Sequence, residues 1–132
     1  ARCLTPFTFD LMRDIMFNLE SATIGIIGLG YVGLPLAVEF CKKRTTLGFD
    51  LKTERIAELR RGIDSTREVT GEELRNAVQL ELTNSIEDLR RCTVFIIAVP
   101  TPIDANKRPN LSPLEEASRS VGQVLNRGDI VI

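Results

Sequence analysis

The stretch "TIGIIGLGYVGLPLAVEF", residues 23–40, constrains the fold more than any other part of the sequence. An apolar, β-branched run leads directly into three glycines, Gly28, Gly30 and Gly33, and apolar residues at helical spacing follow over 31–43. This order predicts a buried strand, a tight turn and a helix that packs back on the strand. Such a corner is the building unit of α/β folds with a parallel sheet.

The same alternation continues to the end of the chain. Strands are expected at 23–28, 45–49, 80–83, 93–99 and 129–132. Helices are expected at 31–43, 52–61, 71–78, 85–91 and 113–127. The pattern predicts an α/β, Rossmann-type doubly wound parallel sheet. Because the sequence stops at "GDIVI", inside the last strand, we expect a sheet truncated at about the fifth strand, in a piece of a longer protein.

Local signals mark several helix starts. Thr70 with Glu73 fits a capping box. Ser112 with Glu115 fits a second one, and Pro113 would then occupy the first helical position. The last helix is expected to pack on the sheet through one apolar face, formed by Leu114, Ala117, Val121, Val124 and Leu125.

Residues 1–22 precede the first strand and are expected to form an N-terminal extension of a domain at 23–132. Leu11, Ile15 and Leu19 lie at helical spacing, which predicts a short amphipathic helix. This helix could dock on a partner or a membrane surface. Since the segment lacks a basic face, a leader helix packed on its own domain is the favoured interpretation.

Composition argues against several classes of function. The 132 residues carry a formal net charge of -1 and no histidine, so nothing points to nucleic-acid binding or to a histidine general base. The 3 cysteines form no CxxC pair, which argues against a metal site or a disulfide framework. Cys41 and Cys92 lie in or beside apolar segments and are expected to be buried as small hydrophobic side chains. No apolar run approaches the ~20 residues of a membrane span, and no stretch near the start has the pattern of a signal peptide, so a cytoplasmic location is expected.

The context of the glycines points to a dinucleotide site. They follow a strand-like run, open a helix and precede a second strand, which leads to Asp50, roughly 20 residues after Gly28. Gly28 would permit the tight turn, because glycine tolerates backbone angles that other residues avoid. Gly30 would let the backbone approach a pyrophosphate, and Gly33 would let the helix and the strand pack closely.

The residues around this turn extend the prediction to a particular cofactor. The free N–H groups of Tyr31 and Val32, at the start of the helix, would point at the phosphates. A carboxylate at the end of the second strand accepts hydrogen bonds from ribose hydroxyls and repels a 2′-phosphate, so Asp50 favours NAD over NADP. Lys52 and Arg55 leave NADP open, because a basic side chain there could accommodate the extra phosphate. NAD is preferred since the acid lies at the strand end itself.

The fourth predicted strand ends in an unusual turn, "VPTPID", at residues 99–104. The carboxyl ends of parallel strands are where ligands bind in such folds. Pro100 and Pro102 stiffen this loop, and Thr101 offers a hydroxyl. A ligand-binding loop and a rigid loop without a ligand contact both fit these residues.

Further segments around this turn carry a family resemblance: "IGIIGLGYVGLPLAVEF", "GFDLKTERIAELRRG", "DANKRPNLSPLEEAS" and "GDIVI". With them, residues 23–132 closely resemble the nucleotide-sugar dehydrogenases of the UDP-glucose/GDP-mannose dehydrogenase family. Within that family the chain is most similar to the UDP-N-acetylglucosamine and UDP-N-acetylgalactosamine 6-dehydrogenases of Vi-antigen and O-antigen synthesis. The UDP-glucose dehydrogenase branch usually has a Tyr-Glu-Pro-Gly-like stretch where this chain reads "GIDSTREVTGEEL", which favours the N-acetylhexosamine branch.

The resemblance implies an NAD-dependent oxidation of the C6 alcohol of a UDP-sugar, in two steps, through an aldehyde to a carboxylate. It implies that the glycine turn holds the pyrophosphate and that Asp50 and Arg55 hold the adenosine ribose. It also implies that five residues line the cofactor near the nicotinamide: Val99, Pro100, Thr101, Pro102 and Ile103. The full-length enzyme is expected to be a homo-oligomer.

The catalytic residues of the family have no counterpart in this chain. The family's catalytic cysteine lies far downstream in a Gly-Gly-x-Cys context, as do its assisting lysine, asparagine and threonine, and none of these motifs occurs here. We therefore expect no catalytic residue in this chain, no activity of the chain alone, and a UDP-sugar bound mostly by residues beyond Ile132. The alternatives are a UDP-glucose 6-dehydrogenase, a β-hydroxyacid or 6-phosphogluconate-like dehydrogenase and, from another class, a non-catalytic NAD-sensing module.

Overall fold

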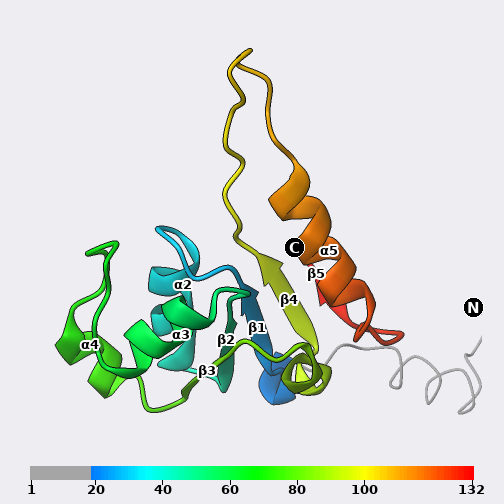
Figure 1. The fold of residues 1–132 in the computed structure, drawn as a ribbon. Coiled ribbons are helices and arrows are strands. Elements are labelled where there is room, and N and C mark those ends of the chain that lie inside the picture. Colours follow the sequence, from blue (N-terminus) through cyan, green and yellow to red (C-terminus); the bar gives the residue numbers. More distant parts are fainter. Residues whose placement is uncertain (1–18) are drawn as a thin grey trace, which may run out of the picture.

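The structure, a computed structural model, describes residues 19–132 (Figure 1). Its strands are β1 (Ile24–Ile27), β2 (Thr46–Phe49), β3 (Leu80–Thr83), β4 (Val94–Ile97) and β5 (Ile130–Val131). Its α-helices are α2 (Gly33–Cys41), α3 (Thr53–Arg60), α4 (Gly71–Asn76) and α5 (Ser112–Gly122), with short 3-10 helices η1 (Leu19–Ser21) and η2 (Ile86–Arg91). The amphipathic helix expected in the N-terminal extension falls mostly on residues 1–18, which lie outside the described residues.

All five strands form one parallel sheet in the order β3-β2-β1-β4-β5. The predicted Rossmann-type, doubly wound α/β fold is thereby confirmed. From β1 the chain moves outward through β2 to β3, and it then returns to place β4 on the other side of β1 (Figure 1). The carboxyl ends of β1 and β4 therefore flank the point of reversal, where sheets of this topology bind ligands.

Side chains of the central strand β1 point alternately into two hydrophobic layers. Ile24 and Ile26 of β1 belong to one buried cluster, together with residues of α2 and α3. Ile27 belongs to a second cluster, together with residues of η2 and α5. Both faces of the sheet are thus covered, which explains why β1 and β4 are apolar at almost every position instead of alternating with polar residues.

The predicted capping box at Thr70 is confirmed. Thr70 Oγ1 accepts a hydrogen bond from the amide of Glu73 at 3.2 Å, and Glu73 Oε2 accepts one from the amide of Thr70 at 2.8 Å. The second predicted capping box is wrong. Ser112 is the first residue of α5 and not its N-cap, and its amide donates to Asn110 Oδ1 at 3.0 Å. Because the Asn110 side chain already satisfies this amide, the start of α5 does not depend on a serine hydroxyl.

Replacing Thr70 by alanine should lower the free energy of unfolding by about 1 kcal/mol, because the first turn of α4 loses its side-chain acceptor. Urea unfolding curves measure the change. Ser112→Ala is the matched control, since it removes a hydroxyl that caps no helix, and it should stay within about 0.5 kcal/mol of the parent. Equal losses in the two variants would contradict the capping assignments.

The fifth helix differs from its prediction in length and in its buried face. It ends at Gly122 and not near 127. Val121 and Val124 are buried as expected, whereas Leu114 and Leu125 remain 38% and 44% exposed. The predicted segment 85–91 is helical as expected, but η2 is a 3-10 helix.

Residues 99–111 leave the sheet as a long excursion between β4 and α5 (Figure 1, yellow to orange). Ile103 and Pro109 form an antiparallel bridge, and the amide of Asn110 donates to the carbonyl oxygen of Pro102 at 2.6 Å. Lys107, with a φ of 60°, lies in the turn at the tip. The "VPTPID" turn therefore begins at the edge of the sheet and continues away from it.

Two of the cysteines are core residues, as predicted. Cys41 and Cys92 are buried, and burial raises the pKa of both thiols, that of Cys92 to about 12. Neither thiol is therefore a nucleophile near neutral pH. Cys3 lies outside the described residues. Across residues 19–132, no three His, Cys, Asp or Glu side chains gather as a metal site, and no helix has the length and apolar character to cross a membrane.

Candidate functional site

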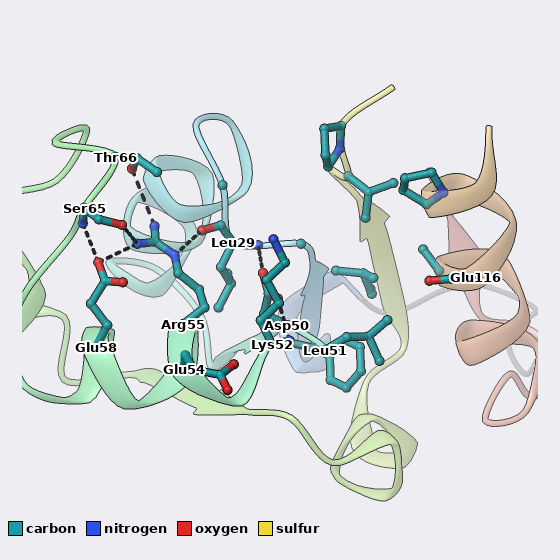
Figure 2. A pocket seen from close by; sticks show the side chains of 18 residues that line it. Leu29, Asp50, Leu51, Lys52, Glu54, Arg55, Glu58, Ser65, Thr66 and Glu116 are labelled. Atoms are coloured by element: carbon teal, nitrogen blue, oxygen red, sulfur yellow. Dashed lines mark hydrogen bonds and ion pairs between the residues drawn. The ribbon is translucent and has the colours of Figure 1, made fainter. Parts of the chain in front are cut away.

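A cavity of about 730 Å³ lies at the carboxyl edge of the sheet. Its walls come from the turn between β1 and α2, the ends of β2 and β4, the start of α3, residues 65–66 and the first turns of α5. Figure 2 shows Arg55 with Glu58, Ser65 and Thr66 at one end of this cavity and Glu116 of α5 at the other. The cavity therefore occupies the crevice that the strand order predicts for a ligand.

Gly28 and Gly33 have the mechanical roles that the motif predicts, and the role of Gly30 beside a pyrophosphate stays a prediction. Gly28 has a φ of +96°, which only glycine adopts without strain. A Cβ on Gly33 would lie 1.7 Å from the carbonyl oxygen of Gly28, so no side chain fits where α2 meets the turn. A Cβ on Gly30 would meet nothing within 4 Å. No atom of the described part of the protein therefore requires a glycine at this position. The open space beside Gly30 fits a ligand.

Free backbone donors surround this space. Among the described residues, none accepts a hydrogen bond from the amides of Gly30, Tyr31 or Val32. Tyr31 and Val32 are 70% and 67% exposed, and no side chain caps the helix at Val32. A helix that begins with unpaired N–H groups and the positive end of its dipole is a binding site for an anion. The turn therefore fits a pyrophosphate.

Asp50 lies at the end of β2 and faces the glycine turn. Its Oδ2 accepts a hydrogen bond from the amide of Leu29 at 3.0 Å, and its Oδ1 accepts one from the amide of Lys52 at 2.9 Å (Figure 2). An ionised carboxylate has about four acceptor positions, so about two remain. The carboxylate is thus held in place and still able to accept from ribose hydroxyls.

Arg55 has more protein contacts than the sequence indicated. Its side chain is 10% exposed, and Nε donates to the carbonyl oxygen of Leu29 at 2.8 Å. Nη1 donates to Glu58 at 2.9 Å and to Ser65 at 3.3 Å. Nη2 donates to Asp64 Oδ1 at 2.7 Å and lies 3.5 Å from Thr66 Oγ1. All five N–H groups of the guanidinium therefore have acceptors within the protein. Its contact with a ribose stays a prediction.

Asp64 holds Arg55 by an ion pair, as Glu58 also does, and sequence reasoning missed it. Its side chain is fully buried, and Oδ2 accepts hydrogen bonds from the amides of Glu68 and Val69, both at 3.0 Å. Burial alone would raise the pKa of Asp64. Hydrogen bonds from the Thr66 hydroxyl, the Arg55 guanidinium and the amides of Val69 and Thr66 outweigh burial and lower the pKa from 3.8 to about 2. The signal was available in "DST", because aspartate side chains often accept from amides that follow them in a turn.

The Asp64 carboxylate makes the free energy of unfolding depend on pH in the acid range. A pKa that folding lowers contributes stability above its unfolded value, so the contribution of Asp64 is complete above pH 3.8 and is lost as pH falls toward 2. The shift corresponds to about 2 kcal/mol. Urea unfolding of the parent and of Asp64→Asn at pH 6, 4 and 3 tests this, and the difference between the two proteins should shrink as the pH falls. A difference that stays constant with pH would contradict the assignment.

The five residues from Val99 to Ile103 divide between the cavity and the excursion. Val99 and Pro100 line the cavity beside the end of β4. Thr101, Pro102 and Ile103 are exposed and do not belong to its lining. Contact of these three with a cofactor stays a prediction. The opposite wall comes from α5, which the sequence placed only against the sheet, through Pro113, Glu116 and Ala117.

Comparison with known proteins identifies the family of this chain. Residues 22–132 match the UDP-glucose/GDP-mannose dehydrogenase family, NAD binding domain. The chain belongs to this family. The matched part of the UDP-glucose/GDP-mannose dehydrogenase family is its NAD-binding domain, so NAD is the cofactor, and the resemblance seen in the sequence is confirmed.

Individual members of the family are similar over most of this chain. It is 58% identical over 114 residues to a UDP-N-acetyl-D-glucosamine 6-dehydrogenase of Pseudomonas aeruginosa, covering 86% of this chain and 27% of the relative. It is 56% identical over 117 residues to a UDP-N-acetyl-D-glucosamine 6-dehydrogenase of Salmonella typhi, covering 89% of this chain and 28% of the relative. The solved UDP-D-ManNAc dehydrogenase of Pyrococcus horikoshii superposes with a TM-score of 0.78 at 36% identity, over 83% of this chain and 27% of that one. The chain thus spans about 27% of the length of these relatives.

Proposed function

We propose that this chain is the NAD-binding domain of a nucleotide-sugar 6-dehydrogenase, which oxidises the C6 alcohol of a UDP-N-acetylhexosamine to the uronate in two NAD-dependent steps. One observation carries the proposal: a glycine turn with unpaired amides opens onto a cavity that also contains the Asp50 carboxylate. The two relatives above are UDP-N-acetyl-D-glucosamine 6-dehydrogenases, which supports the choice of substrate.

The cavity and the start of α2 beside it supply the contacts of this proposal, although Tyr31 and Val32 are not among the residues that line the cavity. The amides of Gly30, Tyr31 and Val32 bind the pyrophosphate, and the Asp50 carboxylate accepts hydrogen bonds from the adenosine ribose. Val99 and Pro100 form the wall beside β4, toward the nicotinamide. When bound, NAD supplies the hydride acceptor for each oxidation step. The chain's own contribution is to bind and orient it.

The charges of the cavity support NAD over NADP. Asp50, Glu54, Glu58 and Glu116 line it against two cationic side chains, those of Lys52 and Arg55. The Arg55 guanidinium has no unused N–H group with which to bind a 2′-phosphate. The negative charges of the lining therefore oppose the extra negative charge of NADP. Lys52 is the one cationic side chain of the described lining that is not already bonded to acceptors within the protein.

An assay of NADH formation by the protein encoded by the complete reading frame tests the proposed reaction. With UDP-N-acetylglucosamine or UDP-N-acetylgalactosamine it should form NADH, two molecules for each sugar converted to the carboxylate. Parallel assays with UDP-glucose distinguish the closest alternative, a UDP-glucose 6-dehydrogenase. NAD binding without turnover of any UDP-sugar would contradict the proposal and favour an NAD-sensing module. The division into residues 1–22 and 23–132, the cytoplasmic location and the homo-oligomeric state stay predictions.

A further inference from the structure

Two consecutive peptide groups of the glycine turn are each held by a charged side chain. The bond from the Leu29 amide to Asp50 fixes the peptide between Gly28 and Leu29. The bond from Arg55 Nε to the Leu29 carbonyl oxygen, 2.8 Å long, fixes the peptide between Leu29 and Gly30. Leu29 itself is fully buried, so its side chain holds the turn from a third direction.

The second of these bonds sets the direction of a phosphate-binding donor. In a trans peptide the C=O and N–H groups point in opposite directions, and the described residues contain no cis peptide bond. Because the Leu29 carbonyl points at Arg55, the Gly30 amide points away from Arg55. Gly30 lines the cavity, and no described residue accepts a hydrogen bond from its amide.

Arg55 can hold Leu29 only if the guanidinium itself is held. Its Nη2 forms an ion pair with Asp64 Oδ1 at 2.7 Å, and the Asp64 side chain is fully buried. The guanidinium is a rigid, planar group, so a contact that fixes Nη2 also restricts where Nε points. Asp64 in turn is held by the amides of Glu68 and Val69. A chain of direct bonds therefore runs from the loop after α3 to the glycine turn.

We propose that Asp64 is a positioning residue of the dinucleotide site, which acts through Arg55 and the Leu29 carbonyl to aim the Gly30 amide at the pyrophosphate. The inference rests on the proposed NAD-binding function. Asp64 does not line the cavity, so it contributes without touching the ligand. Arg55, which does line it, acts here as a link and not as a donor to the cofactor.

Asp64→Asn in the full chain is the first test. Asparagine has one acceptor oxygen, so its NH₂ group must face either Arg55 or the backbone amides, and both are donors. The Gly30 amide resonance, measured by NMR without NAD, should shift, and calorimetry should show NAD binding at least fivefold weaker. Thr70→Ala is the matched control, because it destabilises the neighbouring start of α4 without touching Arg55. It should change neither quantity.

Arg55→Lys provides a second variant if Asp64→Asn does not fold. One ammonium group cannot reach both the Leu29 carbonyl and Asp64 as the guanidinium does, so the same two changes are expected. If Asp64 acts through Arg55, the double variant Asp64→Asn/Arg55→Lys should have the same NAD affinity as the single variant with the lower affinity. If the two residues acted independently, the fold-losses of the two single variants would multiply.

The outcomes separate this inference from the function on which it rests. An unchanged Gly30 resonance and unchanged NAD affinity in Asp64→Asn would overturn the positioning role and leave the NAD site intact. Equal effects in Thr70→Ala would also overturn it. If the parent chain binds no NAD, the proposed function of this chain fails, and the Gly30 resonance of the two variants still decides whether Asp64 orients the turn.

Discussion

Replacing Gly33 by alanine should destabilise the protein by about 3 kcal/mol or more and lower the melting temperature by about 10 °C or more. The added Cβ would lie 1.7 Å from the Gly28 carbonyl oxygen, and neither atom can move unless the backbone that carries it moves. Relief requires α2 to move away from β1, which opens the contacts of Leu34 and Ala37, both fully buried in the core. Thermal unfolding followed by circular dichroism measures the loss.

Gly30→Ala is the matched control for this variant. A Cβ there meets nothing within 4 Å, and the φ of Gly30 lies outside the left-handed region, so stability should change by less than about 1 kcal/mol. The methyl group would occupy the space left beside the free amides, and NAD binding should weaken about tenfold or more. A Gly33→Ala protein as stable as the Gly30→Ala protein would contradict the assigned roles of the two glycines.

Replacing Asp50 by alanine should weaken NAD binding by more than tenfold, equivalent to more than about 1.4 kcal/mol. The substitution removes the acceptors for the ribose hydroxyls and also releases the Leu29 amide, which donates to Asp50 at 3.0 Å. Both losses reduce the affinity, the first by direct contact and the second by loosening the glycine turn. Isothermal titration calorimetry with NAD measures the combined effect.

Asp50→Asn separates the two contributions. Asparagine has one acceptor oxygen, so it can still accept from the Leu29 amide only if its NH₂ group faces the Lys52 amide, and it removes the charge that repels a 2′-phosphate. The affinity for NADP should therefore rise relative to that for NAD, while the Leu29 amide keeps its acceptor. Unchanged affinity of Asp50→Ala for NAD would remove the ribose assignment.

The sequence was sufficient for the parts of the fold that local chemistry dictates. The apolar run before Gly28, the spacing of the three glycines and the acid at Asp50 predicted the strand, turn, helix and second strand. The parallel sheet followed, because strands that alternate with helices can hardly be arranged otherwise. These are features in which neighbouring residues carry the whole signal.

The remaining features depend on residues that are distant in sequence. Arg55 was predicted to hold a ribose, but its acceptors lie in the glycine turn, on its own helix and in residues 64–66. No periodicity reveals such a network, although the turn tendency of aspartate at Asp64 could have indicated part of it. The course of the chain after Pro100 was equally hidden, because an exposed excursion has no apolar pattern that fixes its direction.

Titration of this chain with NAD and with NADP, under identical conditions, tests the central claim most directly. The Asp50 carboxylate, the acidic lining and the saturated Arg55 guanidinium predict that NAD binds at least tenfold more tightly than NADP. Equal affinity for the two dinucleotides, or no binding of NAD, would contradict the claim that this cavity is an NAD site selected by Asp50.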